Sequence, residues 1–259
     1  MIVGIENVTR DRESFDWWWP MHLAELAELV DVLCVRADPR HLTKIKRLLD
    51  ASPLAGRYEL KRQERKKFGK FQEDNERQRL LEWALATGAG YAVSFDADEV
   101  LEPGGGRALR TLLNGPAGAS FRLFRFILTY SSHHRPGYVL PRGEIRPWRA
   151  FALDKLARNY LYQADADGLH CGTVPYPGVG SVSVPDLRVI HYHATSAAEF
   201  MEERAFYADT IEVARHGGLD WLYRCDRFGD ESMAIPLEQE LAGAAERLAR
   251  VADGSGLAR

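Results

Sequence analysis

The alternation of short apolar runs with helical segments in the first hundred residues constrains the fold of this chain more than any other feature. Three short apolar runs end in polar residues and predict buried strands: residues 2–5, 30–35 and 91–95. Three segments with helical periodicity predict amphipathic helices: residues 14–30, 42–49 and 75–86. Strands that alternate with helices in this way predict an α/β fold with a mostly parallel central sheet flanked by helices.

The second half of the chain is less regular, and no linker divides it from the first half. It predicts helices at residues 107–113, 196–216 and 237–252. It predicts strands at residues 120–130, 148–153 and 187–193. Residues 131–147 mix His, Pro, Gly and Arg and predict a long loop. We therefore expect a single domain over residues 1–259.

The composition excludes several classes of protein. A chain of 259 residues with 46% hydrophobic residues and a net charge of -3 can bury a large core, so it is not a disordered chain. Its three cysteines, Cys34, Cys171 and Cys225, form neither a disulfide framework nor a zinc ribbon. No apolar stretch approaches the roughly 20 residues that a membrane span needs. The first residues carry no signal-peptide features, so we expect a cytoplasmic protein without a transmembrane segment.

Two carboxylates follow the third predicted strand, in the sequence Phe95-Asp96-Ala97-Asp98-Glu99. In extended chain, Asp96 and Asp98 project to the same side, just beyond the end of the strand. Ligands of open α/β sheets bind outside the carboxyl ends of the strands. Two oxygen ligands at this place suit Mg²⁺ or Mn²⁺ bound together with a diphosphate. Acidic residues are also common where a strand gives way to a turn, and two carboxylates also suit acid–base hydrolysis.

Several segments resemble nucleotide-sugar glycosyltransferases of the GT-A fold, and bacterial members of the family-2 type in particular. Residues 71–103 carry an arginine-bearing helix, an apolar strand and the Asp96-Ala97-Asp98-Glu99 turn. Residues 189–196, followed by Glu199 and Phe200, are similar to the H-Y…S-x-E-F signature of such enzymes. Residues 146–151 and 168–170 are similar to the acceptor-side strand and the following His-bearing loop. The loops after the first two strands depart from the pattern of the family.

The resemblance spans about residues 2–205 and implies a GT-A-type, Rossmann-like fold with a smaller antiparallel region on the acceptor side. Residues 1–103 would form the half that binds the nucleotide sugar, and residues 104–195 the acceptor half. Residues 196–259 would form the C-terminal helices. The implied activity is metal-dependent transfer of a sugar from a nucleoside-diphosphate sugar to a hydroxyl or amine. Inversion at the anomeric carbon is expected, and retention stays open. The acceptor is left open among a glycan, a lipid-linked molecule, a small molecule, a protein and a nucleic acid.

The resemblance also implies roles for single residues on the donor side. Asp96 and Asp98 would hold Mn²⁺ or Mg²⁺, and either His191 or His193 would be the third ligand, because neutral imidazole binds metals well. The implied contacts to the diphosphate come from Arg77 or Arg79 together with Asp96. The implied contacts to the nucleoside lie at the ends of the first two strands: Glu6, Thr9, Arg10 and Asp38.

On the acceptor side, an inverting transferase needs a carboxylate base within hydrogen-bond reach of the acceptor. Three loop residues are candidates for this base, without a choice among them: Glu144, Asp165 and Asp167. His170 is expected near the acceptor. Trp148 has two interpretations, as a surface that stacks on a sugar and as a core residue.

Two alternative functions remain open, a sugar-phosphate nucleotidyltransferase on a related fold and a non-catalytic module that binds nucleotide sugars. The first would normally carry a Gly-rich phosphate loop after the first strand, which residues 5–9 lack.

Two further segments are not explained by these hypotheses. Among Trp17, Trp18 and Trp19 at least one side chain is expected to be partly exposed, because three consecutive helical residues cannot face one core. The basic run 57–70 is interpreted as a solvated helix or loop, with an anionic acceptor as the alternative.

Overall fold

The computed structural model describes residues 1–8, 15–64, 73–121, 123–132, 135–140, 148–154, 181–192, 196, 198–199, 201 and 231–258. The strands are β1 (Ile2–Val8), β2 (Val32–Ala37), β3 (Tyr58–Arg62), β4 (Tyr91–Val93), β5 (Glu99–Leu101), β6 (Leu123–Ser131), β7 (Tyr138–Leu140), β8 (Trp148–Ala152), β9 (Ser181–His191) and β10 (Ile235–Pro236). The helices are α1 (Phe15–Leu29), α2 (Leu42–Asp50), α3 (Glu73–Ala86), α4 (Gly105–Asn114), α5 (Pro116–Ala119), α10 (Leu237–Glu240) and α11 (Ala244–Asp253), with a 3₁₀ turn η1 (Glu231–Met233).

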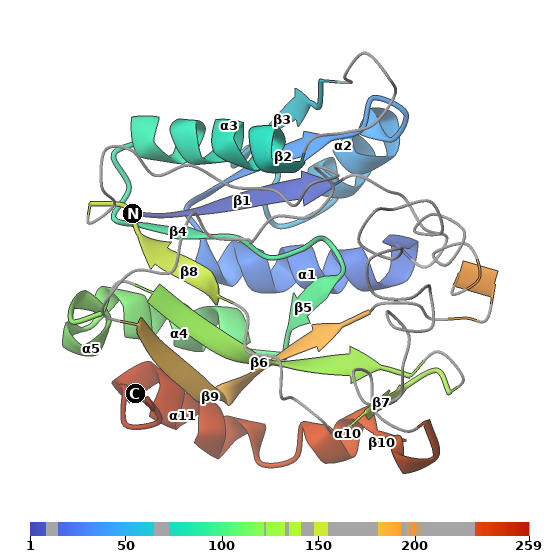
Figure 1. The fold of residues 1–259 in the computed structure, drawn as a ribbon, viewed down its shortest axis with the longest axis vertical. Helices are drawn as coiled ribbons and strands as arrows, with labels where there is room; N and C mark the ends of the chain where they lie inside the picture. Colours follow the sequence, from blue (N-terminus) through green and yellow to red (C-terminus); the bar gives the residue numbers. More distant parts are fainter. Residues whose placement is uncertain are drawn as a thin grey trace, which may run out of the picture.

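These strands form one sheet with a parallel half and a mixed half (Figure 1). In the parallel half the order is β3-β2-β1-β4, and every neighbouring pair is parallel. The strand direction changes where β8 pairs antiparallel with β4, with Ala150 of β8 opposite Val93 of β4. Beyond β8, strand β6 pairs antiparallel with β8 and β7 but parallel with β9, and β5 pairs antiparallel with β9. This arrangement confirms the predicted α/β class, with its parallel sheet and a region of antiparallel pairing.

The parallel half is buried on both faces, as its continuous apolar strands predict. On one face, Val3 and Ile5 of β1 pack with Leu80 and Leu81 of α3. The opposite face is covered by α1 and α2, whose residues Leu26 and Ile45 share one apolar cluster with Leu33 of β2. All residues of β1 are buried. Gly4 allows a close approach there, because an added Cβ would lie 2.7 Å from Cδ1 of Leu33.

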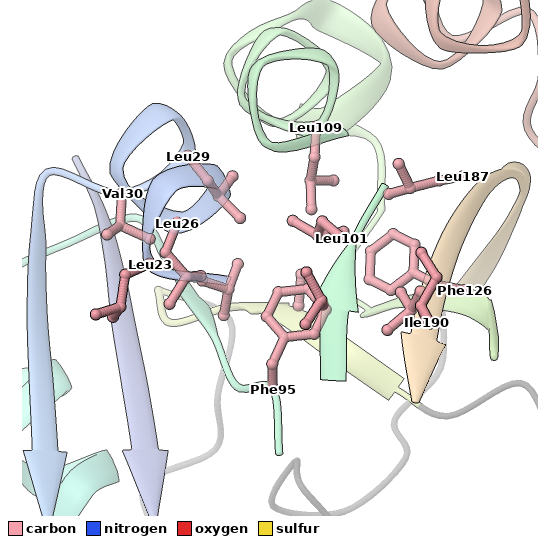
Figure 2. Packing of buried hydrophobic residues seen from close by; sticks show 14 of the residues in the cluster. Leu23, Leu26, Leu29, Val30, Phe95, Leu101, Leu109, Phe126, Leu187 and Ile190 are labelled. Carbon is pink, nitrogen blue, oxygen red and sulfur yellow. The ribbon is translucent and has the colours of Figure 1, made fainter. Parts of the chain in front are cut away.

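The core on the α1 side links the two halves of the sheet. In Figure 2, Leu26 of α1, Leu109 of α4 and Leu101 of β5 lie in one apolar cluster. Phe95, the last residue of the third predicted strand, belongs to the same cluster. The Phe95 ring lies 6.2 Å from the ring of Phe126 on β6. Since Phe95 directly precedes the acidic turn, this packing fixes the position from which the turn leaves the sheet.

Several predicted boundaries were wrong. The expected helix 237–252 is two helices, α10 and α11, separated by Gly243 in a left-handed conformation (φ 70°). Strand β9 begins at Ser181, earlier than predicted, and β7 lies within the predicted long loop. Most of the predicted helix 196–216 falls outside the described residues. The single domain over 1–259 and its division near residues 103 and 195 stay predictions.

The basic run was also misinterpreted where the structure describes it, because residues 58–62 form strand β3 at the edge of the sheet. Arg57 donates to the backbone carbonyls of Ala27, Val30 and Pro53, so it joins the end of α1 to this strand. Lys61 pairs with Glu59 on the same strand. Charged residues on an edge strand discourage pairing with other chains.

None of the described helices is long and apolar enough to cross a membrane.

The three consecutive tryptophans behave as predicted. Trp18 and Trp19 are buried in the core, whereas the side chain of Trp17 is 51% exposed. Trp19 stacks on Phe15 with ring centroids 4.6 Å apart. One face of the first turn of α1 therefore builds the core, and the other presents an indole ring to solvent.

This difference in burial predicts different effects on stability. Trp19→Ala should lower the free energy of unfolding by about 3–5 kcal/mol, because it removes a fully buried aromatic side chain and leaves a cavity. Trp17→Ala should lower it by less than about 1.5 kcal/mol. Urea unfolding of both variants measures the two values, and equal losses would contradict the described packing of α1.

Candidate functional site

Polar residues gather at the carboxyl edge of the parallel half of the sheet. Strands β1, β2 and β4 are parallel, so their carboxyl ends meet at this edge. Asp38 follows β2, and its backbone N–H donates to the carbonyl of Val8 at the end of β1 (3.0 Å). Asp96 and Asp98 follow β4. The polar residues that follow β2 and β4 therefore lie at one edge of the sheet.

The acidic turn between β4 and β5 is held by its own hydrogen bonds. The backbone N–H of Glu99 donates to the carbonyl of Asp96 (2.8 Å), which closes the turn. The N–H of Asp96 donates to a carboxylate oxygen of Glu99 (3.1 Å). Glu99 is almost fully buried, whereas the side chain of Asp96 is 36% exposed. The turn thus points Glu99 into the protein and leaves Asp96 accessible.

Two guanidinium groups hold the carboxylate of Asp96. Arg77 of α3 donates to Oδ1 at 2.6 Å, and Arg149 of β8 donates to Oδ2 at 3.1 Å. Arg149 also pairs with both carboxylate oxygens of Glu99. Both arginines are themselves buried. The result is a compact cluster of two cations and two anions, in which each buried charge has a partner of opposite sign.

The charges in this cluster shift the titration of its members. Burial by itself raises the pKa of Asp96, but Arg149 and Arg77 outweigh burial and hold that pKa below its usual value. Burial raises the pKa of Glu99, and Arg149 only partly opposes this. Burial would lower the pKa of Arg149, yet the carboxylates of Glu99 and Asp96 raise it. Asp96 is therefore an anion at neutral pH.

Asp98 meets His191, which lies 93 positions away in the sequence at the end of β9. Nε2 of His191 lies 3.2 Å from Oδ1 of Asp98. The antiparallel pairing of β5 with β9 places Glu99 opposite His191, and the N–H of Tyr192 donates to the carbonyl of Asp98 (2.7 Å). Burial lowers the pKa of His191, but Asp98 outweighs burial and raises it above its usual value. The sheet thus brings together two of the residues predicted to bind metal.

Glu6 and Asp38, which are predicted to contact the nucleoside, are both too buried for a ligand to touch them directly. Glu6 points toward α1 and pairs with Nε2 of His22. Among the described residues its second oxygen, Oε2, has no hydrogen-bond partner. Asp38 accepts hydrogen bonds from the side chain of Arg40, which is itself largely exposed. Asp38 therefore positions Arg40 at the rim of this edge.

The two arginines predicted to face the diphosphate lie in different places. Arg77 contacts Asp96 and also Ser94 (3.4 Å). Arg79 pairs with Glu64, beyond the end of β3, and both side chains are exposed. The structure therefore brings Arg77, and not Arg79, to the acidic turn.

Other predicted site residues lie outside the described residues: Thr9, Arg10, Glu144, Asp165, Asp167, His170 and His193. Trp148 begins β8, and only its backbone is described. Their predicted roles stay predictions.

Sequence reasoning missed Arg149 and His22. Arg149 stands between apolar residues in strand β8, and a charged residue in a buried strand requires a partner of opposite charge. This signal could have marked Arg149 as part of a buried cluster. His22 lies in a helix rich in apolar residues, where nothing in the sequence indicates Glu6 as its partner.

The donor set fits a metal ion only in part. Asp98 and His191 offer a carboxylate oxygen and an imidazole nitrogen close to each other. Because Asp98 raises the pKa of His191, the imidazole must lose its proton before it can bind Mn²⁺ or Mg²⁺. Both oxygens of Asp96 already accept from guanidinium groups, whose charges oppose a cation there. In the part of the chain that the structure describes, no group of three His, Cys, Asp or Glu residues could hold a metal ion.

No protein-family model matches the chain, and no curated protein matches it either. Among solved structures, it is similar to a mannosyltransferase from Pyrobaculum calidifontis in complex with GDP-Man and Mn²⁺ (13% identity, TM-score 0.47, 98% of this chain and 73% of that chain). It is also similar to TarS from S. aureus (12% identity, TM-score 0.40, 98% and 82%). A third is 4-diphosphocytidyl-2C-methyl-D-erythritol synthase from Anaerococcus prevotii (11% identity, TM-score 0.37, 60% and 70%). These values are too low to argue a family or an activity for this chain.

The cluster around Arg149 predicts a large loss of stability when its central cation is removed. Arg149→Met should lower the free energy of unfolding by about 3–5 kcal/mol, because the carboxylates of Asp96 and Glu99 lose a buried partner. Arg79→Met is the matched control, since it removes an exposed arginine from an exposed pair and should leave stability close to that of the wild type. Urea unfolding at neutral pH compares the two variants, and a wild-type value for Arg149→Met would refute the described cluster.

Proposed function

We propose that this chain is a metal-dependent glycosyltransferase that moves a sugar from a nucleoside-diphosphate sugar to a hydroxyl or amine, with inversion at the anomeric carbon. The observation that carries the proposal is the approach of His191 to Asp98 at the carboxyl edge of the sheet. These residues come from distant parts of the chain, and a ligand bound at this edge of an α/β sheet would meet both. The resemblance of the acidic turn and of the segment around His191 to such enzymes supports the same activity.

Asp98 and His191 would hold Mn²⁺ or Mg²⁺, with His193 as the other candidate imidazole. When bound, the ion would offset the negative charge that develops on the departing diphosphate. Asp96 keeps two proposed roles, as a metal ligand and as a group that faces the diphosphate. Its guanidinium partners favour the second role, because the carboxylate orients Arg77 at the same edge.

The nucleoside would lie beyond the ends of β1 and β2. Thr9 and Arg10 would contact it from the loop after β1. Asp38 would act through Arg40, whose exposed guanidinium it holds. Glu6 is buried and pairs with His22, so it would act on the donor indirectly, through the end of β1. Arg79, which lies with Glu64 away from the acidic turn, is the weaker of the two arginine candidates.

The acceptor would enter from the antiparallel side of the sheet. One carboxylate among Glu144, Asp165 and Asp167 would take the proton from the acceptor hydroxyl as its oxygen attacks the anomeric carbon. The bond from that carbon to the diphosphate oxygen breaks in the same step, and the diphosphate leaves with the bonding electrons. Trp148 and His170 are proposed to line the acceptor side.

A nucleotidyltransferase and a non-catalytic binding module are the two alternatives. A nucleotidyltransferase would release pyrophosphate from a nucleoside triphosphate in the presence of a sugar phosphate. A binding module would bind nucleotide sugars without turnover and without need of a metal. Assays of pyrophosphate release and calorimetry of binding separate both from a glycosyltransferase.

The test is hydrolysis or transfer of the donor in the presence of Mn²⁺, measured over a panel of nucleoside-diphosphate sugars. Asp98→Asn should lower kcat/KM by about 100-fold or more, because it removes a ligand of the ion that stabilises the leaving group. Asp96→Asn should lower it as well, since it releases Arg77. Asp186→Asn is the matched control, because Asp186 pairs with Arg250 of α11 and lies outside the site. Full activity in both site variants would refute the proposal.

A further inference from the structure

His191 meets Asp98 in only one orientation of its imidazole ring. Nε2 of His191 lies 3.2 Å from Oδ1 of Asp98, and a turn of the ring about either of its side-chain bonds would carry this nitrogen away. The pairing of β5 with β9 fixes where the side chain of His191 leaves its strand, but not how the ring is turned. The direct contact with Asp98 cannot hold the ring once a ligand of both side chains comes between them. A further contact with the ring is therefore needed.

Tyr130 makes a contact of this kind from strand β6. Strand β6 pairs parallel with β9, and the register places Tyr130 opposite His191. The two ring centroids lie 5.0 Å apart at an interplanar angle of 62°, which is an edge-to-face arrangement. Tyr130 is itself buried and belongs to the large apolar cluster of the core. The core therefore fixes the phenol ring, and the phenol ring can fix the imidazole.

The other neighbour of His191 in the sheet is engaged elsewhere. Strand β9 lies between β5 and β6, so Glu99 and Tyr130 stand on either side of His191 in one row across the sheet. Both carboxylate oxygens of Glu99 pair with Arg149. Of these two neighbours, Tyr130 is the one whose ring packs against the imidazole.

We propose that Tyr130 is a positioning residue that holds the imidazole of His191 with Nε2 toward Asp98. The proposal rests on the proposed function, in which Asp98 and His191 bind a divalent ion together. A ligand group that is already oriented loses less rotational freedom on binding, so the ion binds more tightly. The contact is between rings, and the effect therefore belongs to the aromatic ring of Tyr130 and not to its hydroxyl.

Three substitutions on strand β6 test this role: Tyr130→Leu, Tyr130→Phe and Phe124→Leu. Tyr130→Leu removes the ring, and Tyr130→Phe keeps it. Phe124→Leu is the matched control, because Phe124 is a buried ring near the other end of the same strand. It packs against Phe121 and Tyr91 and not against His191.

The first measurement is the affinity for Mn²⁺, alone and with saturating UDP or GDP, from the electron paramagnetic resonance signal of the unbound ion. Tyr130→Leu should weaken Mn²⁺ binding by roughly two- to tenfold, which is the effect of freeing one side chain. Tyr130→Phe and Phe124→Leu should bind Mn²⁺ as the wild type does, although Phe124→Leu loses a buried ring.

The second measurement is the NMR spectrum of the protein without metal, with the ring signals of His191 assigned by His191→Gln. Tyr130→Leu should move these signals, because they lose the ring current of the phenol, and Phe124→Leu should leave them in place. In the wild type, nuclear Overhauser contacts between the ring protons of Tyr130 and His191 are expected, and this result does not depend on the folding of any variant.

The positioning role would be overturned if those Overhauser contacts were absent, or if Tyr130→Leu bound Mn²⁺ as tightly as the wild type. Equal weakening in Tyr130→Leu and Phe124→Leu would also overturn it, since both would then report a general loss of structure. In each of these cases a loss of Mn²⁺ affinity in Asp98→Asn would leave the proposed function standing. If the wild type binds no Mn²⁺, or if Asp98→Asn binds it unchanged, the proposed function fails, and the positioning role fails with it.

Discussion

The buried guanidinium of Arg149 is the constraint on which the site depends. It stands on β8, the strand at which the sheet changes from parallel to antiparallel pairing, and it pairs with Glu99 and Asp96 of the acidic turn. A buried cation of this kind requires carboxylate partners in a fixed geometry. The same contacts therefore satisfy Arg149 and hold both carboxylates of the turn, Asp96 and Glu99, against β8.

The rest of the site follows from how the turn continues. Because β5 begins at Glu99 and pairs antiparallel with β9, His191 arrives beside Asp98, and Tyr192 arrives beside the start of α1. The apolar packing of Phe95 and Leu101 between α1 and β6 holds this short strand in place. The approach of His191 to Asp98 and the contact of Tyr192 with Trp17 are therefore consequences of one strand pairing.

The sequence was sufficient for those features that depend on local pattern and not for those that depend on distant partners. Alternating strands and helices predicted the parallel half, and the position of Asp96 and Asp98 after an apolar strand predicted the carboxyl edge. Strand β3 was missed because charged residues interrupt its apolar pattern, as is common for an edge strand. The partnership of Arg149 with Asp96 spans 53 positions, and no local pattern indicates it.

The central claim is that this edge binds a nucleoside diphosphate through a divalent metal ion. Thermal unfolding of the wild type with a panel of nucleoside diphosphates and their sugars, with and without Mn²⁺, tests it most directly. A ligand that binds only the folded chain raises Tm, and a concentration of 100 times Kd adds about 2.7 kcal/mol of stability. We predict that at least one nucleotide raises Tm strongly with Mn²⁺ and much less without it. The claim would be contradicted if no nucleotide raised Tm, or if the rise were the same without metal.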